Sequence, residues 1–197
     1  KAPFLGAKVV SEIPLDELFS LINRSALFRI SWGAANAKGE KWEKYEHDFS
    51  ERLKAMRGVL DERPWLSASA LYGYFPCQSE RDDLVIFDPT RKDKQEIARF
   101  RLPRQPGRQS LCLSDYFAPQ SSNRMDIAAF QIVTLSKGST EFVHRLPAAG
   151  NITEAFYHHG LAVQLTEAAA QWIHRRIRKE LRLDARQGKR YSWGYPA

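Results

Sequence analysis

Two stretches in the first third of the chain repeat apolar residues at helical spacing. In the first, Pro14 to Ile22, one face carries Leu15, Leu18, Phe19 and Ile22. Pro14 suits a first helical turn, and the acidic residues after it suit the positive end of a helix. In the second, Gly39 to Arg63, a single stripe is formed by Trp42, Tyr45, Phe49, Leu53, Met56 and Leu60. The spacing predicts a short amphipathic helix followed by a long one.

A third helical stretch lies in the C-terminal part of the chain. The residues Asn151-Ile-Thr-Glu154 have the spacing of a capping box, which marks the start of a helix. The apolar face then continues at Leu161, Leu165, Ala168, Trp172, Ile173, Ile177 and Leu181. This pattern predicts one long helix from about Ile152 to Leu183.

Between the second and third helices the pattern changes to short apolar runs, which are typical of strands. These runs are Ser69–Phe75, Leu84–Phe87 and Ile97–Leu102. The longer run Ile127–Leu135 predicts a central strand, and the segments Pro103–Ser110 and Pro119–Arg124 predict loops. Because the strands cluster instead of alternating with helices, we expect an α+β fold: a twisted antiparallel sheet flanked by long helices.

The composition is that of a globular protein. The 197 residues are 43% hydrophobic, which is enough to bury the core of one domain. No apolar run is long enough to span a membrane, and the first residues lack the pattern of a secretory signal. We therefore expect a single domain over residues 1–197, located in the cytoplasm and without a membrane partner.

The formal net charge of +7 makes nucleic acid a partner to consider. The excess is concentrated between Arg175 and Arg190, mostly on the predicted long helix. A solvated helix face accounts for such a run. A nucleic-acid-binding stripe is the alternative, and it predicts steeply salt-dependent binding. We expect only weak, non-specific retention and no nucleic-acid partner.

The chain carries no familiar metal, phosphate or nucleophile motif. Cys77 and Cys112 are far apart, and the five histidines have no metal-ligand spacing, so we expect no metal site. Phosphate-binding loops and nucleophile elbows are absent from the sequence. Cys77 could act as a nucleophile, but a lone cysteine after a strand is more often a small buried hydrophobe. We predict no catalytic residue.

Two features could contribute to a ligand site. Glu167 lies among small residues on the predicted long helix, where a ligand could approach closely; an ordinary exposed glutamate is the simpler alternative. The tail from Gln187 to Ala197 combines Arg190 with three aromatic rings and Gly194. That combination suits a flat heteroaromatic ligand with an acidic group. A terminal loop packed on the core explains the tail equally well.

The tail also carries a family resemblance. Arg190-x-x-x-Gly-Tyr-Pro-Ala197 resembles the R-x-x-x-G-Y-P-A-C-P signature of the activation domain of vitamin B12-dependent methionine synthase. Further blocks resemble that family in the same order along nearly the whole chain. They are Leu71–Ser79 (V-x-G-x-F-P-A-N), Asp82-Asp83 (D-D-I), Leu111–Pro119 (L-C-L-A-D-F-V-A-P), Met125–Val133 (D-Y-I-G-A-F-A-V-T) and His159–Ala168 in the long helix.

The resemblance implies a function in cofactor rescue, as one domain of a multidomain enzyme. Such a domain binds S-adenosylmethionine beside the corrin of a neighbouring cobalamin module. An electron from reduced flavodoxin or a similar carrier converts cob(II)alamin to cob(I)alamin, which the sulfonium methyl group traps as methylcobalamin. The family's methyl transfer from methyltetrahydrofolate to homocysteine, its zinc and most cobalamin contacts belong to other modules. The isolated domain is expected to bind without turnover.

The resemblance also implies a set of ligand contacts. Glu167 would meet the amino group of S-adenosylmethionine and Arg190 its carboxylate. The backbone from Ser192 to Gly194, together with Tyr195, would hold the adenosyl part. A guanidinium–carboxylate pair would be the strongest anchor.

Two departures from the family pattern affect this assignment. Asn23 stands where the family has an aspartate that contacts the ligand's amino group; its amide oxygen can accept a hydrogen bond but carries no charge. The sequence ends at Ala197, before the family's Cys-Pro and a further tyrosine, which indicates a truncated chain. Asn23 keeps an alternative open: a non-catalytic module that docks a corrinoid protein or flavodoxin.

Overall fold

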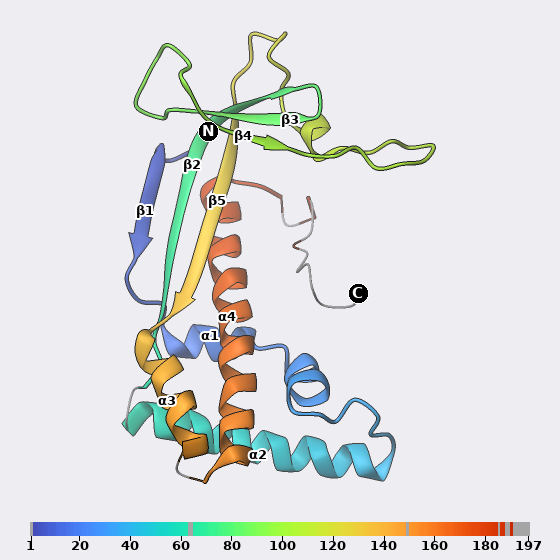
Figure 1. Cartoon of the computed structure of the whole chain (residues 1–197), viewed down its shortest axis with the longest axis vertical. Coiled ribbons are helices and arrows are strands. Elements are labelled where there is room, and N and C mark those ends of the chain that lie inside the picture. The colour runs from blue at the N-terminus through green and yellow to red at the C-terminus, as the bar shows by residue number, and fades with distance from the viewer. Residues whose placement is uncertain (1, 63–64, 149, 185, 188–189, 191–197) are drawn as a thin grey trace. The chain divides into compact units, whose positions relative to one another are not determined.

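The computed structural model describes residues 2–62, 65–148, 150–184, 186–187 and 190 (Figure 1). The chain divides into two compact units. The first comprises Lys1–Lys8, Leu71–Gln131 and Arg176–Lys189, and the second comprises Val9–Ala70, Ile132–Arg175 and Arg190–Ala197. The elements in chain order are β1 (Gly6–Val10), α1 (Leu15–Leu21), η1 (Ala26–Ser31), α2 (Glu40–Glu62), β2 (Ala68–Glu80), β3 (Asp83–Phe87), β4 (Glu96–Arg101), η2 (Leu113–Tyr116), β5 (Asp126–Leu135), α3 (Lys137–Ala148) and α4 (Ile152–Glu180).

The strands form one five-stranded sheet in the order β1-β2-β3-β4, with β5 also paired to β2. The β2–β3 and β3–β4 pairs are antiparallel, with Cys77 opposite Ile86 and Leu84 opposite Phe100. The predicted α+β fold with an antiparallel sheet is therefore confirmed. The prediction that β5 is the central strand is wrong, because β2 pairs with three strands and β5 pairs with β2.

The exposure of β5 explains that error. Phe130 and Ile132 are 36% and 65% exposed, so a mainly apolar run did not mean burial on both faces. Strand β2 is longer than its apolar run, since it continues past Phe75 through Pro76 to Glu80. In the first unit, a core cluster of Cys77, Leu84, Ile86 and Ala128 joins residues from β2, β3 and β5.

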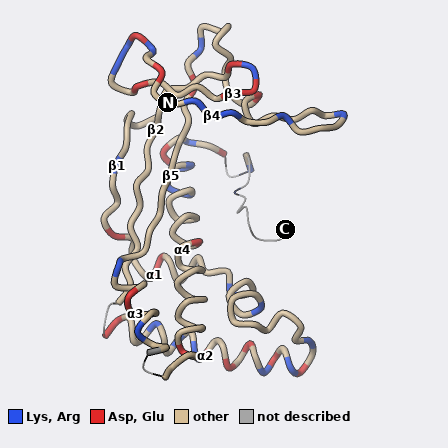
Figure 2. Tube along the Cα trace, viewed as in Figure 1, with Lys and Arg blue, Asp and Glu red and all other residues tan. Residues whose placement is uncertain are grey.

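The helices of the second unit follow the predicted periodicity. Helix α1 begins after Pro14 and buries Leu18. Helix α2 buries four positions of its predicted stripe, Phe49, Leu53, Met56 and Leu60, whereas Tyr45 stays 36% exposed. Acidic and basic residues are interspersed along α2 (Figure 2), as expected of a solvated helix face.

Helix α4 confirms the long C-terminal helix and its predicted start at Ile152, but not its capping box or its last residue. The carboxylate of Glu154 accepts hydrogen bonds from Arg52 Nη1 at 2.7 and 2.9 Å, so it is not the reciprocal partner that a capping box requires. The helix ends at Glu180 and not at Leu183. Arg182 follows with a φ of 56°, the left-handed conformation that commonly terminates helices.

Four elements were not predicted from the pattern: β1, the π-helical turn η1, the 3-10 helix η2, and α3. Each is short or ambiguous in sequence. Strand β1 has only five residues, and α3 contains Pro147 near its end. Such segments depend on their tertiary neighbours for stability, since isolated short helices and strands are marginal.

Candidate functional site

Helix α4 presents Glu167, the first residue predicted to bind a ligand. Its carboxylate Oε2 lies 2.6 Å from Nη2 of Arg190 and forms an ion pair with it. The two side chains are 32% and 23% exposed, so the pair is partly shielded from water. The structure thus brings together two predicted residues that lie 23 positions apart in the chain.

Asn23 lies three residues before η1, which begins at Ala26. Its side-chain Oδ1 accepts a hydrogen bond from the Ala26 backbone N–H at 3.0 Å, and its backbone oxygen accepts one from Leu27 at 2.9 Å. Asn23 therefore stabilises the turn that follows it, as N-cap residues do. The side-chain oxygen of Asn23, which was predicted to accept a hydrogen bond from a ligand, already accepts one from the Ala26 backbone.

Two contacts hold the segment that contains Asn23 against α4. At one end of this segment, Trp172 Nε1 donates a hydrogen bond to the Glu17 carboxylate. At the other end, Gln164 Nε2 donates to Ser31 Oγ at 3.3 Å. Asn23 lies between Glu17 and Ser31 in the chain, and Glu167 lies between Gln164 and Trp172 along the helix. Asn23 and Glu167 therefore lie in two segments that are joined by one hydrogen bond before and one after each of these residues.

The remaining predicted contacts, Ser192, Gly194 and Tyr195, lie outside the described residues and remain predictions. What the described site offers is a carboxylate and a guanidinium held side by side. Such a pair matches the ammonium and carboxylate groups of a free amino acid, each of which can bind the oppositely charged side chain.

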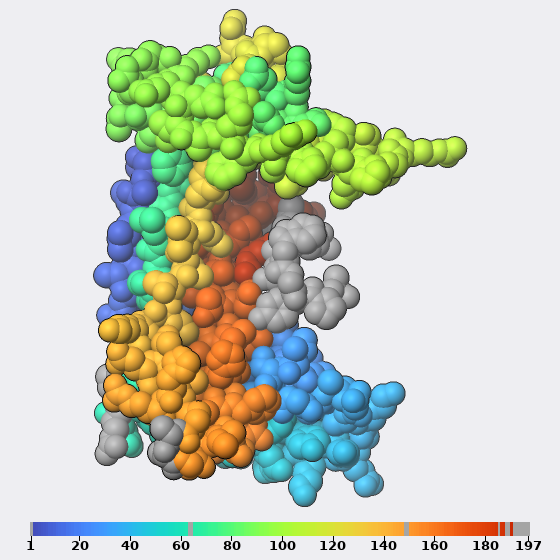
Figure 3. Space-filling view, in the orientation of Figure 1, coloured from blue at the N-terminus to red at the C-terminus, as the bar shows by residue number. Residues whose placement is uncertain are grey.

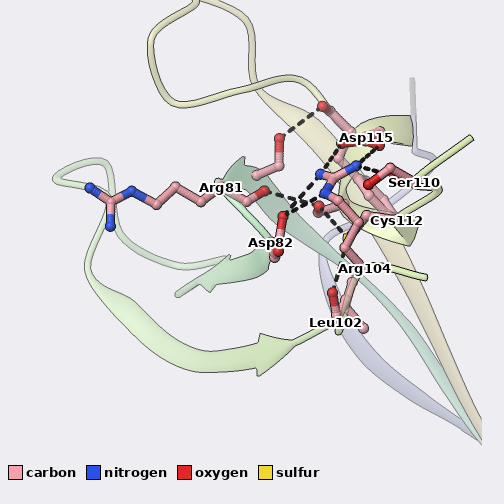
Figure 4. Close-up of polar contacts among 10 residues, drawn as sticks. Arg81, Asp82, Leu102, Arg104, Ser110, Cys112 and Asp115 are labelled. Atoms are coloured by element: carbon pink, nitrogen blue, oxygen red, sulfur yellow. Dashed lines mark hydrogen bonds and ion pairs between the residues drawn. The ribbon is translucent and has the colours of Figure 1, made fainter. Parts of the chain in front are cut away.

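Two blocks of the family resemblance meet in the first unit, at Arg104 (Figure 4). Its Nε and Nη2 atoms donate hydrogen bonds to Asp82 Oδ1 at 3.1 and 2.9 Å, and its Nη1 and Nη2 atoms donate to the Asp115 carboxylate at 2.7 and 2.8 Å. The Ser110 carbonyl accepts a further hydrogen bond at 2.7 Å. Hydrogen bonds from Arg104 lower the pKa of Asp115. Arg104 therefore ties the loop after β4 to the β2–β3 turn and to η2.

Arg104 was not singled out in the sequence, although both of its acidic partners fall within the quoted blocks. Cys112, from the same block, donates to the Leu102 carbonyl at 2.9 Å and contacts Ser114 Oγ at 2.9 Å. These hydrogen bonds give the L-C-L-S-D segment a structural role. In the sequence, the only indication of a bridging cation was that both blocks carry an aspartate, Asp82 in one and Asp115 in the other.

Cys77 is fully buried within β2. Burial raises the pKa of its thiol to about 12, so the nucleophilic thiolate is scarce near neutral pH. The structure supports the interpretation of Cys77 as a small buried hydrophobe.

The carboxylate of Glu180, the last residue of α4, accepts hydrogen bonds from three side chains of the first unit. Tyr72 and Tyr74 each donate a hydrogen bond to its carboxylate at 2.9 Å, and Arg176 Nε donates at 2.9 Å. Burial raises the pKa of Glu180, but these hydrogen bonds lower it by more, so the net pKa is below the ordinary value. Burial, and then the bond to Glu180, raises the pKa of Tyr72 and Tyr74. This network connects the end of α4 to β2.

Glu180→Gln is expected to destabilise the protein by about 1–2 kcal/mol at neutral pH, because the variant lacks the charge that strengthens these hydrogen bonds. A lowered folded-state pKa stabilises the fold above about pH 4.3, the ordinary glutamate value, and that stabilisation is lost as the pH falls through the folded value. We therefore expect the free energies of unfolding of the variant and the parent, measured with urea across this pH range, to converge at acid pH. Glu43→Gln, at an exposed position of α2, serves as the control. A difference in unfolding free energy between Glu180→Gln and the parent that stays constant with pH would contradict the expectation.

Within the described ranges, no group of three histidine, cysteine or acidic side chains could hold a metal ion. The helices of the same part of the chain are all too short or too polar to cross a membrane.

The elements and their pairing define an α+β domain built on a single five-stranded sheet. A solved structure described as "Crystal Structure of the MetH Reactivation Domain bound to AdoHcy" superposes with a TM-score of 0.76 over 90% of this chain and 57% of that chain, at 24% identity. The similarity establishes a common fold.

The family model for the vitamin B12 dependent methionine synthase, activation domain, matches residues 15–197, and the chain belongs to this family. The motif resemblance is thereby confirmed. The methionine synthases of Mycobacterium leprae and Mycobacterium tuberculosis are each 31% identical over 194 residues, covering 91% of this chain. The chain spans 16% of the length of each relative, so it corresponds to one part of those enzymes.

Proposed function

We propose that this chain binds S-adenosylmethionine and supports the reductive methylation of cob(II)alamin to methylcobalamin, the reaction that reactivates cobalamin-dependent methionine synthase. The observation that carries the proposal is the Glu167–Arg190 ion pair. Family membership and the AdoHcy named in the description of the structural neighbour support the same ligand class.

The ion pair fits the amino-acid end of S-adenosylmethionine. The ligand carboxylate would take the place of Glu167 on the Arg190 guanidinium, and the ligand ammonium would bind the Glu167 carboxylate. Each of these partly shielded charges exchanges one opposite partner for another, so no charge is left uncompensated. The planar guanidinium favours a bidentate bond to a carboxylate, which would also fix the ligand's orientation.

The other proposed contacts would hold the adenosyl group. By resemblance these are Tyr195 and the backbone at Ser192 and Gly194. Asn23 could add a hydrogen bond to the ligand's amino group only by giving up, or sharing, its bond to Ala26. We therefore assign Asn23 a smaller contribution than Glu167.

The chain's contribution is positional. Cobalamin, when bound by its own module, supplies the nucleophilic metal centre, and bound S-adenosylmethionine supplies the electrophilic methyl group. The residues described here would bind and orient the sulfonium ligand, so that the methyl group faces the corrin. The proposed partners are a cobalamin-binding module and a flavodoxin or similar electron donor. Neither an acid nor a base is required from this domain.

Isothermal titration of the native protein with S-adenosylmethionine tests the proposal. We expect saturable binding of one ligand per chain. A titration indistinguishable from ligand dilution would contradict the proposed function.

A second candidate is a docking module that binds a corrinoid protein or flavodoxin without S-adenosylmethionine. This second candidate is favoured by Asn23, which stands where the family has a charged aspartate and whose side-chain oxygen bonds to the Ala26 backbone. The two candidates differ in the titration: a docking module would bind its protein partner and give no heat with S-adenosylmethionine.

A further inference from the structure

Strand β4 forms an outer edge of the sheet, because it pairs with β3 alone. The backbone N–H of Leu102 donates to the Asp82 carbonyl on the β3 side of the strand. Backbone groups of successive residues point to opposite edges of a strand, so those of Arg99 and Arg101 point away from β3. Among the described residues, none forms a hydrogen bond with these outward groups. The outer edge of β4 therefore offers a row of donors and acceptors to another strand.

An apolar hollow of about 530 Å³ lies beside this edge, in the first unit. Phe100 lines it from β4, Leu113 and Tyr116 line it from η2, and Phe130 lines it from β5. These four side chains are 44%, 63%, 75% and 36% exposed, in the same order. Exposed apolar side chains that are grouped in this way commonly mark an interaction site.

The surroundings of the edge are basic. Residues 91–108, which comprise β4 and most of the loops on either side, contain seven basic and two acidic residues. Figure 2 shows basic positions along β4 and in the loop that follows it, and in Figure 3 this yellow-green loop projects from the first unit. Arg99 pairs with three carboxylates of the sheet, whereas Arg101 is exposed and forms no ion pair with any residue that the structure describes. Charge complementarity therefore requires an acidic partner.

The same charges disfavour a second copy of this chain as the partner. If two β4 strands paired antiparallel about Phe100, Arg99 of each copy would lie opposite Arg101 of the other. Centres at Arg99 or at Arg101 would set that arginine opposite itself. Like charges directly opposite each other on neighbouring strands are destabilising. An acidic strand in the same place would give each arginine an opposite charge.

We propose that the outer edge of β4 binds an extended segment of a partner protein, in which acidic and apolar residues alternate. The segment adds a strand to the sheet through the backbone groups of Arg99 and Arg101. Its acidic residues lie opposite these arginines, and the apolar residue between them lies opposite Phe100, on the face of the hollow. The alternation follows from the strand period, because successive side chains point to opposite faces. This surface contains neither Glu167 nor Asn23, which belong to the second unit, so it is independent of the proposed function.

Peptides test the proposal on the unmodified protein by isothermal titration. The probe is a capped heptapeptide of sequence Glu-Phe-Asp-Leu-Glu-Phe-Asp. We expect it to bind about tenfold more tightly than a shuffled peptide of the same composition, in which the apolar residues are adjacent. A peptide with lysine in place of every acidic residue should not bind. Absence of probe binding would overturn the proposal, and equal affinity of the shuffled peptide would do so too, since it would show attraction by charge alone.

Methylation of the peptide backbone tests strand addition itself. Probe residues opposite Arg99 and Arg101 direct their N–H groups at β4, whereas the residues between them direct theirs away. N-methylation of the acidic residues should therefore weaken binding about tenfold or more, because each methyl group removes a hydrogen bond. N-methylation of the apolar residues should change the affinity by less than about threefold, because their N–H groups face away from β4. The bound probe should also slow hydrogen exchange of the Arg99 and Arg101 amides. Equal effects of the two methylations, or unchanged exchange, would rule out an added strand.

Variants then locate the contact in the protein. Arg101→Pro removes an outward N–H and leaves the bonds to β3 intact, so it should weaken probe binding about tenfold. Arg101→Ala keeps that N–H and loses only an exposed charge, so about threefold weakening is expected. Lys41→Ala on α2 is the control for a general loss of positive charge and should have no effect.

Equal affinities of the proline and alanine variants would contradict strand addition at this edge. If the proline variant does not fold, the methylated peptides decide alone. S-adenosylmethionine titrations should be unaffected by every one of these variants, which separates this surface from the proposed function.

Discussion

Arg190→Ala is expected to weaken S-adenosylmethionine binding by about a hundredfold, as measured by isothermal titration. The variant removes the guanidinium that would hold the ligand carboxylate. It also leaves the ligand carboxylate, partly shielded from water, without an opposite charge. Truncating one member of such a pair typically costs about 2–5 kcal/mol. Because the variant also removes the ion pair with Glu167, the unliganded protein should become slightly less stable.

A control separates the loss of the ligand contact from a general loss of positive charge. Arg101→Ala removes an exposed arginine of the first unit and should leave the affinity unchanged. The double exchange Glu167→Arg with Arg190→Glu keeps an ion pair but reverses its polarity, and it should restore stability without restoring binding. Normal affinity in Arg190→Ala would remove Arg190 from the site.

Gly73→Ala is expected to lower the free energy of unfolding by about 3 kcal/mol, as measured by urea denaturation. A Cβ atom at Gly73 would lie 2.4 Å from the carbonyl oxygen of Gly6 and 2.9 Å from the Cα atom of Ala7. Both are backbone atoms of the neighbouring strand, so neither can turn aside as a flexible side chain could. Strands β1 and β2 would have to separate where they now pair.

The same substitution at Gly58 gives the matched control. Gly58 lies on the exposed side of α2, and a Cβ atom there would meet nothing within 4 Å. Gly58→Ala should therefore stabilise the protein by about 0.5–1 kcal/mol, because alanine loses less backbone entropy in a helix. Equal effects at the two glycines would show that the close approach at Gly73 is unimportant.

The sequence predicted the long helices well because their signal is local and repeated. The stripe from Phe49 to Leu60 occupies one face through several turns, and burial of that face follows directly from the helical period. The strands were located but less well delimited. Strand β2 continues through Pro76 to Glu80, beyond its apolar run, because pairing with β3 and not hydrophobicity sustains its far end.

The candidate site was found by motif and not by periodicity. Glu167 taken alone resembled any exposed helical glutamate, and only the family signature around Arg190 connected the two residues. Their ion pair is now observed, whereas their contacts to a ligand remain proposals. Asn23 was noted for its missing charge, but its bond to Ala26 could not be read from the sequence, since it depends on a π-helical turn that no local pattern predicted.

The sequence by itself determined the long helices, the approximate strands and the family, because each is encoded in residues that are close together or in fixed order. The tertiary structure alone decided which charged groups meet. With 30 basic and 23 acidic residues, the chain allows hundreds of possible pairs. Only folding selects Arg104 for Asp82 and Asp115, and Arg190 for Glu167, since a charge interacts strongly only with neighbours a few ångströms away.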